Sequence, residues 1–569
     1  MNILGISCYY HDAAAVLVQD GNIIAAAEEE RFSRRKHDAS FPKLAIDYCL
    51  AQGKITSSRL DYAVFYEKPF RKFQRIILSS LSAYPQSYKM FREAMRVWLT
   101  QKLWIKQEIA SLLHLDFAKI LFSEHHLSHA ASCFYPSLFK KAAILTVDGV
   151  GEWPTASWGI GEENKISLSG ELHYPQSLGL LYSTFTAFLG FEVNEGEWKV
   201  MGMAPYGKPS YTDKIWKIIN TYSDGSFSLD LSFFSYQYSD KLPFNHKFVD
   251  LFGLPISPDQ AHYVTQKSAD IAASIQLVTE ELLLSLAKYV KRKTNFDYLC
   301  FSGGVALNSV ANWRILKKAG FKNIYIQPAA GDSGGALGAA LYLYHHLLGQ
   351  KKRNTLSTAY LGKQFTNSMI EQFLTGKNIK YTKHSDQELI KYVVKMLEAG
   401  KIVGWMQGSF EWGPRALGGR SILADPRNPR MKEIINAKVK FREAFRPFAP
   451  SVLGEKADLV FTLPKNPKDH LPFRFMLYVV PVKSAWRKKV PAITHIDNTS
   501  RPQLVYRQEN PLYHRLISSF YQKTGVPLVL NTSFNLKGEP IVASPADAYS
   551  TFVRSGIDVL VMGNFICQK

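Results

Sequence analysis

Short apolar runs separated by turn residues open the chain and predict a β-meander. Residues 3–7 and 13–19 form two such runs, and residues 22–27 form a third. Asp20-Gly21 stands between the second and third runs, and both residues tolerate the positive φ that tight hairpin turns require. The pattern therefore predicts three short strands, of which the last two form a hairpin.

A related pattern begins near residue 142. One apolar run ends in Asp148-Gly149, a second covers residues 155–160, and a third starts after a polar turn. Two copies of one strand arrangement predict a duplicated α/β lobe with a cleft between the copies. This layout is typical of the actin-like (ASKHA) ATPase fold.

A histidine pair lies between these two copies, within residues 123–134. His125 and His129 are four residues apart, so on a helix they project from one face. Leu127 and Phe134 belong to an apolar stripe at helical spacing, and the pair points roughly away from that stripe. Such pairs are common in proteins that bind no metal, so the spacing leaves both a metal site and a structural role open.

Two glycine-rich turns follow later apolar strands. Their glycines let backbone N–H groups approach a phosphate or a nucleotide edge. The candidates in the first turn, after the strand at 298–301, are Ser302, Gly303, Gly304 and Asn308. The second turn contains Asp332, with room around its carboxylate, and Gly335 as a further candidate. No GxxxxGK(S/T) run occurs, so the sequence does not support a Walker-type phosphate loop.

A polar segment without periodicity, residues 351–360, predicts a linker between a domain of residues 1–350 and a domain of residues 361–569. Shortly after it, Ser385 and Glu388 form a capping box at the start of an amphipathic helix. An apolar strand follows that helix, so the second domain also has α/β character.

Cations are dense in the second domain between residues 407 and 450. They alternate with Gly, Pro and aromatic residues and follow neither a helical nor a strand period. Because Arg supplies bidentate contacts to phosphate, these loops favour anion binding over a merely charged surface. The cations are Arg415, Arg420, Arg427, Lys438, Lys440, Arg442 and Arg446. Polar groups at 495–503 and 531–535 lie beside apolar strands, a common position for a site.

Composition narrows the class of protein. At 569 residues the chain is too long for one hydrophobic core, and its 46% hydrophobic and 21% charged residues are ordinary for a globular protein. Its five scattered cysteines include no CxxC pair, which argues against a disulfide framework or a zinc ribbon and favours the cytoplasm. No leader peptide and no transmembrane segment are expected.

The net charge of +21 is high for this length. Part of it comes from a basic and aromatic segment, residues 68–106. The simplest prediction is a helical insert with a solvated basic face. Attraction to an acidic acceptor or to a membrane surface stays open as an alternative.

Long motifs are spread over essentially the whole chain. They include His-His-Leu-Ser-His-Ala at 125–130 and Glu-Trp-Gly-Pro-Arg-Ala-Leu-Gly at 411–418, with others at 5–13, 28–37, 196–207, 302–308 and 440–450. On these motifs the chain resembles the O-carbamoyltransferases of the NodU, cephem carbamoyltransferase and tobramycin carbamoyltransferase group.

The resemblance implies an actin-like N-terminal domain and a C-terminal domain similar to the YrdC-type synthases. The C-terminal domain would form carbamoyl-adenylate from carbamoyl phosphate and ATP, with Mg²⁺ as an expected companion of ATP. The N-terminal domain would pass the carbamoyl group to an acceptor hydroxyl. By position, His125, His129, Asp148 and Asp332 would hold Fe²⁺ or another divalent metal. ATP and carbamoyl phosphate would face Arg415, Lys440, Arg446, Arg501 and Ser533.

The resemblance also suggests catalytic residues. His11 is the candidate base that takes the acceptor's proton, and its alternative role is that of a structural turn histidine. Lys199 and Asn308 are candidates for contacts with the adenylate, against a role in loop stabilisation. Arg415 and Lys440 are the catalytic candidates of the first step.

Other functions stay open at this point. The metal motif and the basic charge also allow threonylcarbamoylation of tRNA. Carbamoyl transfer to a cysteine of a hydrogenase maturation partner is a further alternative, against which the lack of a CxxC pair argues, and the actin-like fold alone would allow a nucleotide-dependent scaffold. The fused second domain favours a small-molecule or saccharide acceptor, without nucleic acid, and a homodimer is compatible with it. The residues that choose the acceptor are expected around 68–106 and in the aromatic run 233–238.

Overall fold

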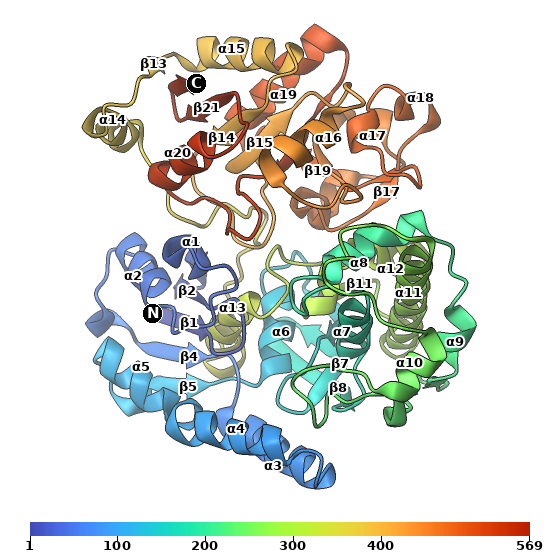
Figure 1. Ribbon diagram of the computed structural model, residues 1–569. Coiled ribbons are helices and arrows are strands. Elements are labelled where there is room, and N and C mark those ends of the chain that lie inside the picture. Colours follow the sequence, from blue (N-terminus) through green and yellow to red (C-terminus); the bar gives the residue numbers. More distant parts are fainter. The chain divides into compact units, whose positions relative to one another are not determined.

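A computed structural model describes residues 1–569, which form two compact units. The N-terminal unit contains Met1–Ala25 and Ala39–Leu356. The C-terminal unit contains Ser357–Lys569 together with the early segment Ala26–Asp38. In Figure 1 the N-terminal unit is mainly blue to green and the C-terminal unit mainly yellow to red.

The first lobe of the N-terminal unit is built on a five-stranded sheet in the order β3-β2-β1-β4-β5. Its strands are β1 (Asn2–Ser7), β2 (Ala14–Gln19), β3 (Asn22–Glu28), β4 (Tyr62–Phe65) and β5 (Ile120–Phe122). β1 pairs antiparallel with β2 and parallel with β4. Strands β1 and β2 are almost entirely buried, as their continuous apolar runs lead one to expect.

The second lobe repeats this arrangement in the order β12-β11-β6-β7-β8. Its strands are β6 (Lys141–Val147), β7 (Pro154–Glu162), β8 (Lys165–His173), β11 (Tyr298–Ser302) and β12 (Asn323–Tyr325). β6 pairs antiparallel with β7 and parallel with β11, as β1 pairs with β2 and β4. The repeated topology confirms the duplicated lobe and the actin-like fold predicted from the sequence.

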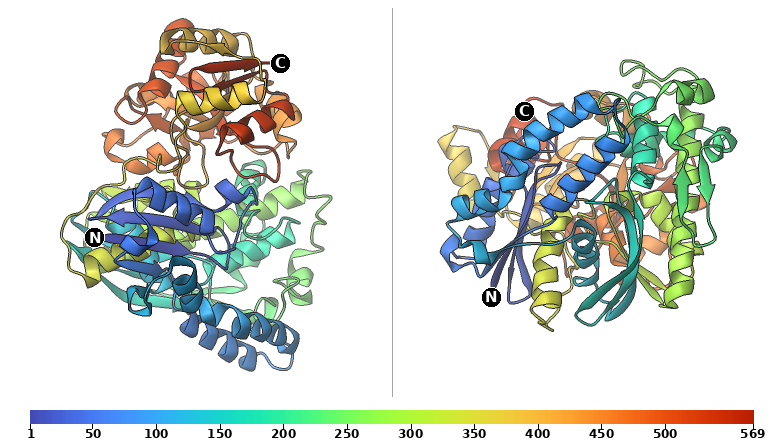
Figure 2. Two further views of the ribbon diagram at one scale, coloured as in Figure 1. Left: turned by 90° about the vertical axis from the view of Figure 1, so that its left-hand side faces the viewer. Right: turned by 90° about the horizontal axis from the view of Figure 1, so that it is seen from below.

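Helices α6 (His125–Phe134) and α13 (Ser333–Tyr342) pack side by side between the two sheets (Figures 1 and 2). Their close approach depends on glycine, because a Cβ at Gly338 would lie 1.7 Å from the carbonyl oxygen of Ser128. On the other side of α13, a Cβ at Gly5 would lie 1.9 Å from the carbonyl oxygen of Ala336. Small residues therefore bring the histidine helix and the turn before α13 together.

The basic segment 68–106 folds as helices, as predicted. It forms α3 (Pro69–Ser82) and α4 (Tyr88–Thr100), which lie at the lower edge of the unit in Figure 1. The other helices of the N-terminal unit are α2 (Lys43–Gln52), α5 (Ile105–Leu113), α7 (Leu178–Phe188), α8 (Glu197–Met203), α9 (Thr212–Trp216), α10 (His246–Phe252), α11 (Gln266–Thr294) and α12 (Ser309–Lys318). Strands β9 (Ile219–Thr221) and β10 (Phe227–Leu229) form a small separate hairpin.

The C-terminal unit is built on one mixed eight-stranded sheet in the order β13-β22-β21-β14-β15-β20-β16-β19. Its strands are β13 (Thr382–Lys383), β14 (Val403–Met406), β15 (Arg420–Ala424), β16 (Ala449–Leu453), β19 (Gln503–Val505), β20 (Leu528–Ser533), β21 (Val559–Met562) and β22 (Phe565–Gln568). A separate pair is formed by β17 (Val480–Pro481) and β18 (Thr499–Ser500).

The helices of this unit complete an α/β domain. They are α1 (Glu30–Ser33), α14 (Asn367–Gly376), α15 (Asp386–Glu398), α16 (Met431–Ile435), α17 (Ala457–Val460), α18 (Ser484–Arg487), α19 (Pro511–Thr524) and α20 (Pro545–Val553). The predicted capping box is present, because Ser385 and Glu388 bond reciprocally at the start of α15. The α/β class that the resemblance to YrdC-type synthases implies is confirmed. Neither unit contains a helix long and apolar enough to cross a lipid bilayer.

Candidate functional site

Two histidines and two aspartates converge where α6 meets the second sheet. The Nε2 atoms of His125 and His129 lie 3.0 Å apart on one face of α6. Asp148 Oδ2 lies 2.9 Å from His125 Nε2 and 3.3 Å from His129 Nε2. Asp332 Oδ1 lies 3.6 Å and 3.5 Å from the same two nitrogen atoms. All four side chains are buried, so the structure brings together the four residues predicted as metal ligands.

The two aspartates are held by different turns. Asp148 follows β6, and its Oδ1 accepts a hydrogen bond from the Gly304 backbone N–H at 3.0 Å. That bond leaves Oδ2 for the histidines and gives the Gly303-Gly304 turn a clear role. Asp332 immediately precedes α13, whose small residues allow it to approach α6. The second lobe therefore supplies both carboxylates, and α6 supplies both imidazoles.

Two glutamates support the histidine helix from behind. The Glu152 carboxylate accepts the backbone N–H of His125 at 3.0 Å and that of Lys68 at 2.8 Å. Glu67 Oε2 lies 3.7 Å from His125 Nδ1 and forms a buried ion pair with Lys72 at 2.7 Å. A carboxylate near the second ring nitrogen orients a metal-binding imidazole and makes it more basic. Neither glutamate could be found from the sequence, since neither has a spacing that connects it to the histidine pair.

The electrostatics of this cluster favour a cation. Burial opposes the charged imidazole, yet Asp332, Asp148 and Glu67 together raise the pKa of His125 well above its usual value. Burial likewise raises the pKa of Asp148, but its bonds with the two histidines lower it well below its usual value. A pocket that draws protons onto imidazoles has an excess of negative charge that a divalent ion would balance. Two imidazoles and two carboxylates are a suitable donor set for Fe, Mn or Zn.

Space remains beside this cluster, and His11 borders it. A Cβ placed on Gly149 would meet no atom within 4 Å. His11 Nδ1 lies 2.9 Å from Asp12 Oδ2, and His11 Nε2 lies 3.9 Å from Asp332 Oδ2. Burial lowers the pKa of His11, but Asp12 and Asp332 outweigh it and raise the pKa to about 9. The ring is therefore oriented by a carboxylate on one nitrogen and turned toward the cluster with the other.

Several predicted nucleotide contacts have partners within the protein. The Asn308 side chain caps α12 by accepting the Ala311 N–H at 3.1 Å and also bonds Gln276. Ser302 Oγ is buried and contacts Ser132 Oγ at 3.1 Å. The remaining candidates of this group are Gly335, where a Cβ would lie 2.6 Å from the Tyr66 ring, and Lys199, whose ammonium lies 5.5 Å from the Phe191 ring. Contact of these residues with a nucleotide stays a prediction.

The C-terminal unit contains a second centre, around Lys440. Its buried ammonium donates to Asn535 Oδ1 at 2.7 Å, to Ser533 Oγ at 3.1 Å and to the Ser533 carbonyl oxygen. Burial, and then the charges of Arg442 and Arg446, lower the pKa of Lys440 well below its usual value. These acceptors are all neutral oxygen atoms. Lys440 is thus a buried cation in a region that holds further cations.

Three arginines contribute to this positive region. Burial lowers the pKa of Arg442 well below its usual value, and Arg446 and Arg501 lower it further. Arg446 Nη1 contacts the buried Glu443 carboxylate at 3.1 Å, and that carboxylate is the acidic neighbour which raises the Arg442 pKa. Arg442 also lies over the Phe448 ring at 4.7 Å. Arg442 belongs to the cation pattern of the sequence, but it is not among the binding residues that the resemblance implied.

Other cations of the same stretch have structural roles. Arg420 is completely buried, and its guanidinium donates to the carbonyl oxygens of Gln407, Gly408, Gly419 and Ala543. Arg427 forms an ion pair with Asp425 at 2.6 Å. The candidates for anion binding are therefore Arg415, Lys440, Arg442, Arg446 and Arg501.

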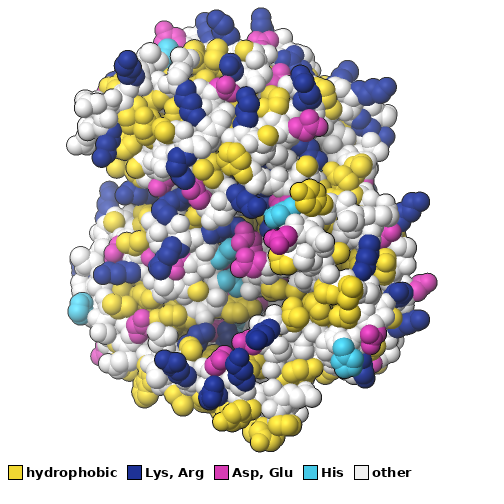
Figure 3. Space-filling view, viewed as in Figure 1, with side chains coloured by type: hydrophobic (Ala, Val, Ile, Leu, Met, Phe, Trp, Pro, Cys, Tyr) yellow, Lys and Arg dark blue, Asp and Glu magenta, His cyan; other side chains and the backbone are white.

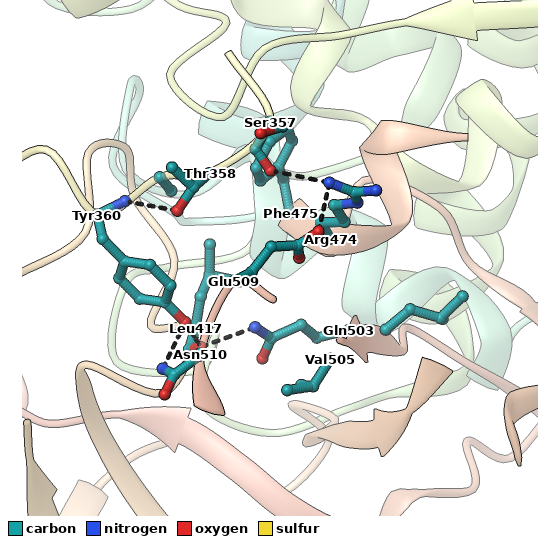
Figure 4. Close-up of a pocket in the computed structure, with 12 residues that line it drawn as sticks. Ser357, Thr358, Tyr360, Leu417, Arg474, Phe475, Gln503, Val505, Glu509 and Asn510 are labelled. Carbon is teal, nitrogen blue, oxygen red and sulfur yellow. Dashed lines mark hydrogen bonds and ion pairs between the residues drawn. The ribbon is translucent and has the colours of Figure 1, made fainter. Parts of the chain in front are cut away.

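The C-terminal unit also contains a small pocket, which none of these five cations lines (Figure 4). The side chains of Tyr360, Arg474, Gln503, Glu509 and Asn510 are among those that line it. Its polar groups are already paired, since Arg474 contacts Glu509 and Gln503 Nε2 donates to the Leu417 carbonyl oxygen at 2.7 Å. Residues 357–360, at the start of the C-terminal unit, and β19 line this pocket from two sides. The pocket offers little room for a ligand.

Family models match both halves of the chain. The model described as "Carbamoyltransferase N-terminus" matches residues 2–341, and the model "Carbamoyltransferase C-terminus" matches residues 394–569. The chain belongs to the carbamoyltransferase family. This membership confirms the resemblance that the motifs indicated. The protein is therefore an enzyme that transfers carbamoyl groups.

Relatives match the chain over nearly its whole length. An uncharacterized protein of Synechocystis sp. is 46% identical, over 100% of this chain and 97% of its own length. Nodulation protein NolNO of Sinorhizobium fredii is 37% identical over 99% of this chain and 79% of its own. Among solved structures, the HypF protein of T. kodakarensis covers 61% of this chain and 48% of its own at 15% identity, with a TM-score of 0.32. That score is too low to bear on function.

Proposed function

We propose that this carbamoyltransferase works in two steps, one in each unit. In the C-terminal unit, water would cleave carbamoyl phosphate to carbamate and inorganic phosphate, and the carbamate oxygen would attack the α-phosphorus of ATP, giving carbamoyl-adenylate and pyrophosphate. In the N-terminal unit, the carbamoyl group would pass from the adenylate to a hydroxyl of a small-molecule or saccharide acceptor, with release of AMP. This proposal refines the family activity by naming the co-substrates and the class of acceptor.

The cation cluster of the C-terminal unit supports the first step. Lys440 is buried and Arg442 and Arg501 are half-buried, and the loss of solvent around each is the main cause that lowers its pKa. Burying several like charges is unfavourable unless an anion neutralises them. A nucleoside triphosphate and a carbamoyl phosphate together supply the required negative charge, and arginine forks match phosphate oxygens geometrically.

The buried cluster of His125, His129, Asp148 and Asp332 is the observation that most supports the second step. These residues would hold a divalent ion, Fe²⁺ by resemblance, which when bound would polarise the adenylate as a Lewis acid. Asp12 would hold the His11 Nδ1–H, and Nε2 of the neutral ring, the form favoured as the pH approaches the His11 pKa of about 9, would take the proton from the acceptor hydroxyl. The acceptor oxygen then bonds the carbamoyl carbon, and the bond from that carbon to the AMP oxygen breaks.

The proposal is tested by measuring pyrophosphate release from ATP in the presence and absence of carbamoyl phosphate. We expect release only when both are present. Labelled carbamoyl phosphate with a cell extract should then yield a labelled acceptor, which mass spectrometry identifies. Pyrophosphate release that does not depend on carbamoyl phosphate would contradict the first step, and label found on tRNA would contradict the acceptor class.

A further inference from the structure

Helix α3 carries two of its cations into the interior of the N-terminal unit. Over α3 and α4 most basic side chains are exposed, and Figure 3 shows them beside apolar side chains at the lower edge of the molecule. Lys72 and Arg75 differ, because they lie one helical turn apart on the inner face and are only 7% and 8% exposed. These two charges are therefore largely shielded from solvent and need a partner.

The carboxylates near the start of α3 are all occupied by other groups. Glu67 pairs with Lys72 at 2.7 Å. Glu124 accepts from Lys68 at 2.9 Å and from Arg71 at 2.8 Å. The Glu152 carboxylate accepts backbone N–H groups at the start of α6 and α3. Every acidic group in this neighbourhood thus has a partner, and none of them is Arg75.

Arg75 makes neither a hydrogen bond nor an ion pair. Its guanidinium lies over the ring of Tyr174, 5.0 Å from the ring centroid, and this is its one polar contact. Burial lowers the pKa of Arg75, while the charges of Glu67 and Glu152 act in the opposite sense from a greater distance. A guanidinium has five N–H donors, and none of the Arg75 nitrogen atoms is fully enclosed, so solvent or a ligand can reach them. Such a residue is expected to have an acceptor that arrives from outside.

Arg75 lies close to the transfer centre. Lys72, on the same face of α3, lies 5.2 Å from the Tyr10 ring, and the Tyr10 ring lies 4.5 Å from that of His11. On its other side, the Tyr174 N–H donates to the Trp153 carbonyl oxygen at 2.8 Å, next to Glu152. The unpaired guanidinium is therefore a neighbour of the residues that surround His11 and His125.

Two tyrosine side chains, Tyr174 and Tyr236, pack one after the other beside Arg75. The rings of Tyr174 and Tyr236 lie 6.3 Å apart, and the Tyr236 hydroxyl donates to the Pro175 carbonyl oxygen at 2.9 Å. Tyr236 belongs to the aromatic run 233–238, so Tyr174 lies between a residue of this run and Arg75 of the basic segment. The sequence predicts that the residues which select the acceptor lie in these same two segments.

We propose that Arg75 binds an oxyanion on the acceptor molecule, a carboxylate, phosphate or sulfate group, with Tyr174 and Tyr236 packing against the rest of that molecule. The acceptor is thus an acidic hydroxylated molecule, which is a narrower class than any hydroxyl compound. A planar guanidinium can bind a carboxylate or phosphate through two parallel hydrogen bonds and so fix the hydroxyl near His11. This inference rests on the proposed transfer of the carbamoyl group in the N-terminal unit.

The test compares ligands that differ in one group. Methyl glucuronide, glucose 6-phosphate and methyl glucoside share sugar hydroxyls, but only the first two carry an oxyanion. Binding of each to the full-length protein is measured by calorimetry, with wild type, Arg75→Met, Arg75→Lys and Arg96→Met. Arg96→Met, at an exposed position of α4, removes the same charge and serves as the matched control.

We expect wild type to bind at least one anionic ligand more tightly than methyl glucoside. Arg75→Met should weaken that binding by about tenfold or more, the loss typical of a hydrogen bond to a charged group. Arg75→Lys should retain part of it, and Arg96→Met should match wild type. The stronger of the two anionic ligands then identifies the preferred oxyanion.

Three results would overturn the proposal. Equal binding of all three sugars by wild type is one, and an equal loss in Arg75→Met and Arg96→Met is another. A loss of AMP binding in Arg75→Met, with sugar binding intact, would assign Arg75 to the adenylate instead. Pyrophosphate release should stay unchanged in Arg75→Met, so failure of the two-step function is seen separately in the wild-type reaction.

Discussion

Arg415 and Arg501 are neighbouring cations in the C-terminal unit, where burial and then the charge of Arg501 lower the pKa of the Arg415 guanidinium well below its usual value. Burial also lowers the pKa of Arg501, to about 10. Two like charges this close together support the proposal that the C-terminal unit binds an anion. The first prediction concerns that anion.

Bound ATP should stabilise the C-terminal unit because it neutralises this positive cluster. A ligand at about 100 times its Kd contributes about 2.7 kcal/mol. For a domain of roughly 150–250 residues this corresponds to about 2–4 °C in Tm per kcal/mol. Thermal unfolding followed by calorimetry should show the shift with ATP or pyrophosphate and none with adenosine. An equal shift with adenosine would place the binding energy on the base and sugar instead.

Arg415→Ala should block the first step and spare the second. Removing a group that stabilises charge in a transition state typically lowers kcat by about 10²–10³-fold. Pyrophosphate release is therefore expected to fall by about that factor, while supplied carbamoyl-adenylate should still be transferred to an acceptor. Arg427→Ala is the matched control, because Arg427 belongs to the same stretch but pairs with Asp425. An unchanged rate in Arg415→Ala would remove this residue from the first site.

His129→Ala should abolish metal retention and acceptor transfer. The substitution removes one of the four ligand atoms that lie within 4.8 Å of one another. Metal content is measured by elemental analysis after dialysis, and pyrophosphate release should stay near the wild-type rate because it occurs in the other unit. His173→Ala, at an exposed histidine paired with Glu171, should keep the metal. Full transfer by a metal-free His129→Ala enzyme would contradict the assignment.

Much of the fold could be predicted because its strands are continuous apolar runs bounded by turn residues. The runs at the start of the chain and after residue 142 appear as β1, β2, β6 and β7 with little change in bounds. The packing of Ala26–Asp38 with the C-terminal unit had no such local signal. It depends on contacts between distant residues, such as Arg31 donating to the Gly413 carbonyl oxygen at 2.7 Å.

Only part of the candidate site could be predicted from residue spacing. Spacing on one helix places His125 and His129 together, but only the fold shows that Asp148 and Asp332 reach the same nitrogen atoms. The support from Glu67 and the unpaired guanidinium of Arg75 could not be inferred. Their roles depend on which charges are buried and which have no partner. Neither property produces a recognisable residue spacing in the sequence.

Close packing of α13 against α6 brings the four candidate metal ligands together. In Gly338→Ala the new methyl group would lie 1.7 Å from the Ser128 carbonyl oxygen, so α13 must move away from α6. Overpacking of this kind costs about 1–3 kcal/mol. Because α13 follows Asp332 directly and α6 carries both histidines, the shift should lower metal affinity as well as Tm. Both are measured on the same sample, by metal titration and by thermal unfolding.

Gly376→Ala is the control, since a Cβ there meets no atom within 4 Å, and alanine should leave stability unchanged or raise it by up to about 1 kcal/mol. Loss of Tm without loss of metal affinity in Gly338→Ala would show that the close approach of the two helices serves the fold and not the site.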